Sequence, residues 1–475
     1  MGVAETTISP TGLRLMLRDS YEIDKFFVEI QELTSEMEPE LAQIDSMLDD
    51  EVIYQTIKAD LAQRYPKTQQ TGRGSTPVAV ILRMLVVKHL YNLSYEKTEK
   101  AVKDSLVLRR FCRVYFETVP DDTTLIRWSN QIKPETLKLL HERVVGLARE
   151  LQVTKGRKLR TDGTVVETHI HYPTDSSLLN DGVRVLSRQL KRAQKVLSEG
   201  GAVTKDVFRN RSRSARHLKR QIERAARQGR AKTKPLYQKL VQISRATLQQ
   251  AQQVLDQLEA VGDAAAGSIG QTLQTFIDRT QQVIEQTVRR VFKDESVPAA
   301  DKLVSIFEPH TDIIKRGKAN HPTEFGHKLW LDEVDGGIVS DYRILAGNPA
   351  DSDQWQPSLD QHIQQFGTVP RQASADRGVQ SAPNEIYARQ QGVKRVILPK
   401  AGHKSAQRRQ HERQAWFRRG RRYQAGIEGR ISVLKRKHGL DRCLNHGQDG
   451  FARWVGWGVI ANNLTIIGRT RAIHA

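Results

Sequence analysis

The sequence predicts an α/β protein in which a mixed sheet with helices is interrupted by a helical insertion and preceded by an all-α N-terminal region. Up to about residue 150, apolar residues recur at helical spacing. From Lys155 onward, alternating segments enriched in β-branched residues favour strands. Between the first such segment and the next, residues 179–297 show almost no strand signal. We therefore expect a helical segment at 1–75, a helical domain at 76–153, an α/β domain formed by 154–180 and 300–470, and a basic helical insertion at 181–299.

The chain is strongly basic. It has 475 residues, with 75 Lys and Arg against 54 Asp and Glu, a formal net charge of +21 and a pI near 9.9. Solubility alone needs a net charge of only ~2 to 8 in a small domain. The excess therefore predicts a polyanionic partner, and nucleic acid is the favoured one.

Two cysteines, Cys112 and Cys443, are too few for a disulfide framework or a cysteine-based zinc site within one chain, which fits a reducing cytosol. The most apolar run, 78–87, is broken by Arg83, and the first residues lack a charged segment followed by a long apolar one. We therefore expect no signal peptide, no membrane partner and a cytoplasmic protein.

Residues 21–51 predict amphipathic helices that act as scaffold. After a polar break at 67–74, a second helical block begins, in which Ser94 can cap the helix that follows it.

A further helix is expected at 125–133, capped by Asp122 or Thr123 and exposing Arg127. Short helices joined by capped turns suit a DNA-binding module of the helix-turn-helix type, in which Arg127 is our candidate DNA contact. A plain helical bundle is the alternative that this segment leaves open.

The first strand is expected within 155–170, and later strands at 327–334, 337–347, 369–376 and 393–400. In the insertion, apolar residues repeat at heptad-like spacing, which predicts a helical hairpin or bundle. Residues 209–239 contain many arginines and lysines and very few acids. Such a run is either a solvated face or a phosphate-binding surface, in which Arg216 and Arg220 are candidate DNA contacts.

Three acidic residues stand where a polar site is expected. Asp162 lies in the middle of the first strand, where burial without a partner would cost roughly several kcal/mol. Asp376 ends a strand, at the carboxyl edge of the sheet where α/β sites lie. Glu428 falls in a helix, on a face that also carries Lys435.

Two strand-borne aspartates and a helix-borne glutamate can hold two Mg²⁺ or Mn²⁺ ions through oxygen ligands. Such ions, about 3.5 to 4 Å apart, activate a water or a 3′-hydroxyl on one side and stabilise the leaving oxygen on the other. Lys435 could bind a phosphate beside them. Because each acid taken singly is more often a surface or salt-bridged residue, the hypothesis of a two-metal site depends on all three.

Several other polar residues have simpler interpretations. His169 and His171 share one side of the first strand, and we expect a surface or partly buried pair and no metal site. Asn348, Asp351 and Asp353 form a turn or a loop that touches DNA, with the turn favoured.

Aromatic and basic residues fill the last part of the chain. We expect Trp416, Trp454 and Trp457 in the core and not as platforms for stacked bases. Residues 408–422 are dense in arginine just before the helix of Glu428, so they are expected to clamp phosphates. The candidate DNA contacts in this run are Arg421 and Arg422.

The segments around the three acids resemble a known family. RTDGTVVETHIHYPTDSSLL around Asp162, SADRGVQS around Asp376 and IEGRISVLKRKHGLDR around Glu428 resemble the acidic motifs of DDE transposases of bacterial insertion sequences, particularly the IS5-like and related unclassified groups. LSYEKTEKAVKDS and PDDTTLIRW resemble the N-terminal helical domain of those enzymes. Together the matches cover 76–180 and 321–464.

This resemblance implies an RNase H-like catalytic fold and Mg²⁺-dependent DNA hydrolysis followed by strand transfer. It assigns Asp162, Asp376 and Glu428 as ligands of the two metal ions, and Lys435 as a basic catalytic residue that also contacts DNA. The implied partner is double-stranded DNA, both the terminal inverted repeats and the target, bound by a homodimer or larger assembly at the bacterial nucleoid. Gln424 departs from the family pattern, because it stands where related enzymes carry arginine, a role left to Arg421, Arg422 or Tyr423.

Two other functions share these features. A transposase-derived regulator would bind DNA without catalysis, and a structure-selective nuclease would cut DNA with the same metal chemistry without joining ends.

Overall fold

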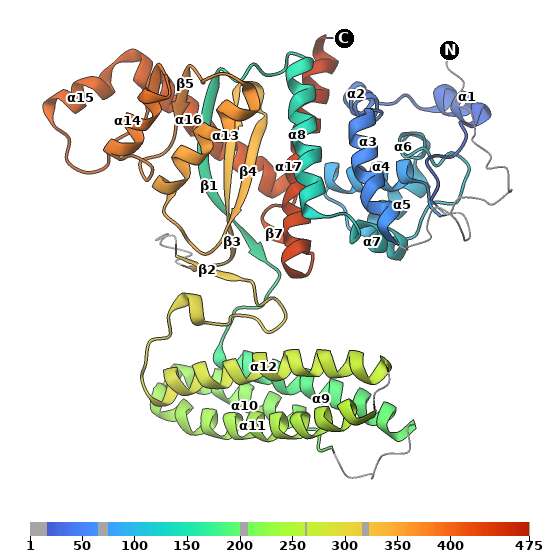
Figure 1. Ribbon diagram of the computed structural model, residues 1–475, viewed down its shortest axis with the longest axis vertical. Helices are drawn as coiled ribbons and strands as arrows, with labels where there is room; N and C mark the ends of the chain where they lie inside the picture. Colours follow the sequence, from blue (N-terminus) through green and yellow to red (C-terminus); the bar gives the residue numbers. More distant parts are fainter. Residues whose placement is uncertain (1–16, 65–74, 200–207, 262–263, 316–322, 475) are drawn as a thin grey trace. The chain divides into compact units, whose positions relative to one another are not determined.

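The computed structural model describes residues 17–64, 75–199, 208–261, 264–315 and 323–474 (Figure 1). The chain divides into two compact units. The first combines Met1–Glu167 with His327–Ala475, and the second is Thr168–Gly326.

The architecture is a mixed α/β one, with a mixed sheet and many helices. The strands are β1 (Lys158–Thr168), β2 (Asp312–Lys315), β3 (Thr323–Val334), β4 (Val339–Leu345), β5 (Gln372–Ser374), β6 (Arg395–Ile397) and β7 (Arg442–Cys443). Their order is β2–β3–β1–β5–β6, and β4 also pairs with β3 and β7 with β1. β1, β5 and β6 run parallel, whereas β4 is antiparallel to β3. All five strands expected from the sequence are thus present, as β1, β3, β4, β5 and β6.

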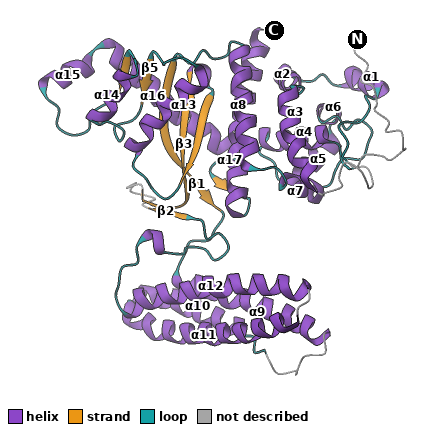
Figure 2. Ribbon diagram, in the orientation of Figure 1, coloured by secondary structure: helices purple, strands orange, loops and turns teal. Residues whose placement is uncertain are grey.

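Helices cover both faces of the sheet in the first unit. Leu159 of β1 and Trp330 of β3 share a core cluster with Leu359 of α13 (Trp355–Phe366). Val166 of β1 points to the other face, because side chains alternate along a strand, and it packs with Leu434 of α16 (Ala415–Lys437). Figure 2 shows α13 lying against the strands.

The other helices of the first unit precede the sheet, connect its strands or follow it. They are α1 (Lys25–Thr34), α2 (Pro39–Met47), α3 (Glu51–Leu61), α4 (Val78–Leu90), α5 (Tyr95–Asp104), α6 (Leu106–Phe111), α7 (Asp122–Ser129), α8 (Pro134–Glu150), α14 (Ala382–Gln390), α15 (Ala406–Arg413) and α17 (Gly447–His474). The cluster that contains Leu159 also contains Ile81 of α4, Leu137 of α8 and Trp457 of α17. One apolar core therefore joins the N-terminal helices to the sheet and the C-terminal helix.

The N-caps of α5 and α7 were both predicted from the sequence, and the structure confirms only the first. Ser94 caps α5 as expected, because its side chain accepts a hydrogen bond from the Lys97 N–H at 3.1 Å. The cap of α7 is Asp121, and not Asp122 or Thr123. Its carboxylate accepts the Thr124 N–H at 2.6 Å, and the helix begins at Asp122, three residues before the expected start at 125, and ends at Ser129 instead of 133.

The second unit is a helical bundle, as the heptad-like spacing predicted. Its helices are α9 (Asp175–Glu199), α10 (Ser212–Ala225), α11 (Arg230–Val261) and α12 (Ala264–Phe292), which lie side by side in Figure 1. Two apolar clusters hold them together. One includes Leu179, Leu218 and Leu240, and the other includes Leu190 and Leu255.

No single helix in the described ranges is long and apolar enough to cross a membrane. By length and composition, only α4 and α5 taken together could do so, as a pair bent by 106°.

Candidate active site

The two aspartates lie at equivalent distances beyond the last registered pair of β1 and β5. β1 and β5 pair in parallel, with Arg160 opposite Ser374 as the last registered pair. Asp162 lies two residues further on within β1, and Asp376 lies two residues further on, just past the end of β5. Neighbouring strands are about 4.8 Å apart. The register therefore brings together two residues that are more than two hundred positions apart in the chain.

Backbone N–H groups hold both aspartates. Oδ1 of half-buried Asp162 accepts a hydrogen bond from the Gly163 N–H at 2.7 Å. Oδ1 of exposed Asp376 accepts one from the Gly378 N–H at 2.9 Å.

Helix α16, which contains Glu428, is hydrogen-bonded to β1, the strand of Asp162. Buried Gln424 donates from Nε2 to the Thr161 carbonyl at 2.9 Å, directly before Asp162. Further along the helix, Lys435 Nζ lies 3.6 Å from the carboxylate of Asp441, whose carbonyl accepts the N–H of Glu167 on β1. The exposed Glu428 lies between these two anchor points, one turn after Gln424.

On another side of α16, two arginines and a buried glutamate hold the helix in place. The guanidinium of Arg160 contacts both oxygens of Glu333, at 2.9 and 2.6 Å, and donates to the Tyr423 carbonyl. Arg430 lies 3.5 Å from the same carboxylate. Arg430 and Glu428 point to different sides of the helix, since they are two residues apart. This network was not predicted from the sequence, although Arg160 shares the strand face of Asp162 by alternation.

A fourth carboxylate lies close to Asp376. Asp351 begins a short 3₁₀ helix (Asp351–Gln354), and its Oδ1 is 2.6 Å from Nζ of Lys328 on β3. A Cβ added to Gly378 would lie 3.3 Å from Oδ1 of Asp376 and 3.5 Å from Oδ2 of Asp351. From the sequence, Asp351 was expected in a turn or a DNA-contacting loop, and its proximity to Asp376 could not be predicted from residue spacing.

The acidic residues offer an all-oxygen donor set, which fits Mg²⁺ or Mn²⁺. Within the ranges that the structure describes, no three His, Cys, Asp or Glu side chains lie close enough together to hold a metal ion. The fold thus brings Asp162 and Asp376 to one end of a strand pair, and Glu428 to the helix alongside, without closing the three carboxylates into a ligand cluster.

The arginines predicted to contact DNA are exposed, at Arg127 on α7, Arg216 and Arg220 on α10, and Arg421 and Arg422 on α16.

Arg408 does not behave as an open phosphate clamp. It lies 2.7 Å from Glu385 and 2.9 Å from Glu412, so two acids neutralise it. Burial alone would raise the pKa of Glu412, but hydrogen bonds from Lys404, the Lys400 N–H and Arg408 lower it to about 2. The prediction for 408–422 is therefore wrong at its first residue, because the partner acid on α14 is distant in sequence.

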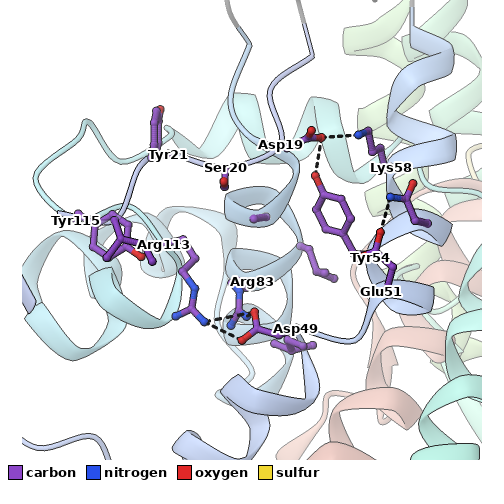
Figure 3. Close-up of a pocket in the computed structure, with 15 residues that line it drawn as sticks. Asp19, Ser20, Tyr21, Asp49, Glu51, Tyr54, Lys58, Arg83, Arg113 and Tyr115 are labelled. Atoms are coloured by element: carbon purple, nitrogen blue, oxygen red, sulfur yellow. Dashed lines mark hydrogen bonds and ion pairs between the residues drawn. The ribbon is translucent and has the colours of Figure 1, made fainter. Parts of the chain in front are cut away.

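A hollow of about 430 Å³ in the N-terminal helices is lined by acids and bases that neutralise each other (Figure 3). Arg83, only 2% exposed, and Arg113 both pair with Asp49, at 2.6 and 3.2 Å. Asp19 lies 2.6 Å from Lys58 and accepts the Tyr54 hydroxyl at 2.7 Å. Burial and then this hydrogen bond raise the pKa of Tyr54. These pairs stabilise the helices and leave no strongly basic surface in the hollow.

Other expectations concern aromatic residues and histidines. Trp454 and Trp457 are in the core as expected, whereas Trp416 is only partly buried. His169 and His171 are exposed, and His171 lies 3.5 Å from Asp181, which agrees with a surface pair.

Comparison with known proteins finds a match in the N-terminal helices. Residues 28–131 match the model of a family described as "Transposase domain (DUF772)". This match spans α1 to α7 and includes 93–105 and 120–128, two segments on which the resemblance of the N-terminal helices was based. It supports a transposase family for this chain, and the mixed α/β architecture is consistent with that class. No curated protein and no solved structure matches the chain.

Proposed function

We propose that this protein is a DDE transposase, which binds the terminal inverted repeats of its insertion sequence and catalyses metal-dependent strand cleavage and strand transfer. The observation that carries the proposal is the β1–β5 register, which sets Asp162 and Asp376 two residues beyond the same pair. The hydrogen bond between Gln424 and Thr161, which docks the helix of Glu428 beside Asp162, supports it further.

The strand order supports an RNase H-like catalytic domain of the IS5-like or a related group. Beginning at β4, the order is β4–β3–β1–β5–β6, with an antiparallel β3–β4 pair and parallel β1, β5 and β6. In open sheets with parallel strands, sites lie beyond the carboxyl ends of the strands, and Asp376 directly follows β5 in this way.

In this proposal the three carboxylates hold two divalent ions, which would activate the attacking oxygen and stabilise the leaving one. The chain's own groups orient the site. The N–H groups of Gly163 and Gly378 fix one oxygen each of Asp162 and Asp376. Lys435, 24% exposed, supplies a positive charge on the flank of α16 that carries Glu428, where a DNA phosphate would be bound.

Double-stranded DNA is the proposed partner, because a net charge of +21 favours binding to a polyanion. Arg127 lies in the segment matched by the transposase model and would contact the terminal repeat. Arg421 and Arg422 are exposed on the first half of α16, ahead of Glu428, and would contact the backbone of the DNA being cut. Joining two ends requires two active sites, so we propose a dimer or larger assembly.

The test uses the full chain and a duplex bearing the ends of the element. With Mg²⁺, the natural protein should nick this duplex and join the cut ends to a target. Asp162→Asn should abolish nicking while DNA binding persists, and Asp256→Asn, at an exposed position on α11, should change neither. Retained nicking by the Asp162 variant would refute the site.

The same assay separates the two alternatives. Specific binding without any metal-dependent cleavage would identify a transposase-derived regulator. Cleavage without joined products would identify a structure-selective nuclease.

A further inference from the structure

Helix α10 of the second unit has two chemically opposite faces. Ala215, Leu218 and Ile222 are buried, with exposed fractions of 0, 8 and 3%. Arg213, Arg216, Arg220 and Arg224 are all exposed. At 3.6 residues per turn, these four arginines fall on one stripe directly opposite the buried residues. The stripe adds Arg213 and Arg224 to the two contacts expected from the sequence.

The charge of this arginine stripe is not neutralised within the protein. Glu223 is the only acid on α10, and it lies 3.5 Å from Lys219. Across the described part of the chain, none of the four arginines forms an ion pair with a carboxylate, whereas nearby Arg230 lies close to Asp294. An ordinary solvated helix face interleaves both signs of charge, and this one does not.

The stripe also has the length and shape for an extended polyanion. From Arg213 to Arg224 it spans about 16 Å at 1.5 Å per residue. Arg213, Arg216, His217 and Arg220 line an open hollow of about 550 Å³. Duplex DNA carries one negative charge per ~1.7 Å of its axis, so a stripe of this length faces several phosphates. Each guanidinium can donate two parallel hydrogen bonds to one phosphate.

We propose that the arginine stripe of α10 binds the sugar-phosphate backbone of duplex DNA, and that the helical unit inserted between β1 and β3 is a DNA-binding module. The contact is independent of sequence, since arginines that touch only phosphates carry no base information. This inference names a DNA-contacting surface for the proposed transposase and rests on that function for its biological role. The binding itself requires no catalysis.

The test measures the affinity of the full chain for a random-sequence duplex across a series of salt concentrations. Replacing Arg213, Arg216, Arg220 and Arg224 by Gln should reduce the magnitude of the slope of log affinity against log salt by about 3.6, because each of the four lost phosphate contacts removes ~0.9. Affinity at low salt should fall by at least about tenfold. Replacing the same four residues by Lys keeps the charge and should retain most of the slope.

A matched control addresses net charge. Arg188, Lys191, Arg192 and Lys195 on α9 are also exposed, and their replacement by Gln removes the same total charge. We expect a smaller change in slope for this control. An unchanged slope in the α10 variant, or an equal change in both variants, would overturn the assignment to α10.

The outcome is independent of the catalytic proposal. If the protein does not nick DNA and the α10 variant binds DNA more weakly, the assignment of the DNA-binding surface is supported and the transposase proposal is wrong. If nicking and joining occur while the α10 variant binds DNA like the natural protein, only the surface inference fails. Circular dichroism of each variant should match that of the natural protein, because the substituted residues are exposed.

Discussion

Arg160 and Glu333 form a two-point ion pair between β1 and β3, with Nε–Oε2 and Nη2–Oε1 distances of 2.9 and 2.6 Å. Glu333 is fully buried, and Arg160 also donates to the Tyr423 carbonyl of α16. The pair therefore fixes the helix of Glu428 to the strand of Asp162. Its contribution can be measured, because removal of one partner leaves a buried charge without compensation.

Glu333→Ala should lower the free energy of unfolding by about 3 to 5 kcal/mol, since Arg160 and Arg430 would then lose their common carboxylate. Urea unfolding monitored by fluorescence measures this change. Arg442→Ala removes a more exposed pair with Glu167 and should cost only about 0 to 1 kcal/mol. Equal losses in the two variants would show that the buried pair has no special role.

Gln424→Leu should slow nicking by about fivefold, the effect of losing one hydrogen bond of ~1 kcal/mol that sets the helix against Thr161. DNA affinity should stay unchanged, because Gln424 is buried and touches no bound phosphate in the proposed site. Gln410→Leu, at an exposed position on α15, is the matched control. A nicking rate equal to that of the natural protein would mean that this bond does not position Glu428.

Gly426 and Gly429 flank Glu428 on α16 and should respond oppositely to alanine. A Cβ at Gly426 would collide with Nη1 of Arg160, so Gly426→Ala should disturb the Arg160–Glu333 pair, reducing both stability and nicking. A Cβ at Gly429 meets nothing within 4 Å. Gly429→Ala should therefore raise the free energy of unfolding by up to ~1 kcal/mol, because alanine favours a helix. Thermal unfolding of the pair compares them directly, and the same sign for both would contradict the geometry.

Gly378→Ala should change the dependence of nicking on metal concentration. The added Cβ would lie 3.3 Å from Asp376 Oδ1 and 3.5 Å from Asp351 Oδ2, which is a tight fit between two carboxylates. We expect the Mg²⁺ concentration at half-maximal nicking to rise several-fold, an order-of-magnitude expectation for a displaced ligand. Gly267→Ala, with nothing within 4 Å, is the control. An unchanged Mg²⁺ dependence would show that Asp376 is not a ligand of the metal ions.

Acid should destabilise the first unit through three buried histidines. Burial lowers the pKa of His141, His362 and His438 to about 4 in each case. Because an unfolded histidine titrates near ~6.5, the unfolded state binds more protons between these values, and stability falls as the pH drops through that window.

The expected loss is roughly 1 kcal/mol per pH unit for each histidine. Urea unfolding at pH 7.5 and 5.5 should show it. His362→Gln should make the dependence shallower, whereas His217→Gln, at an exposed position on α10, should leave it unchanged.

Local sequence patterns were sufficient to predict many of the strands and helices of this protein. Alternation and β-branched residues located five strands, and helical spacing located the bundle of α9 to α12. These features depend on neighbours a few residues away, so the sequence contains them directly. The cap of α7 is Asp121 and not the predicted Asp122 or Thr123, because all three residues are good caps and only the backbone conformation selects among them.

By itself, the sequence determined the basic charge, the order of strands and helices, and the three acids that resemble a transposase site. The tertiary structure alone decided that Asp162 and Asp376 share one register, that Gln424 docks α16 on Thr161, and that Asp351 lies beside Asp376. It also showed that Arg408 is neutralised, whereas the stripe of α10 is not. The reason is physical, because these relationships join residues far apart in the chain through strand pairing and packing, which no local spacing specifies.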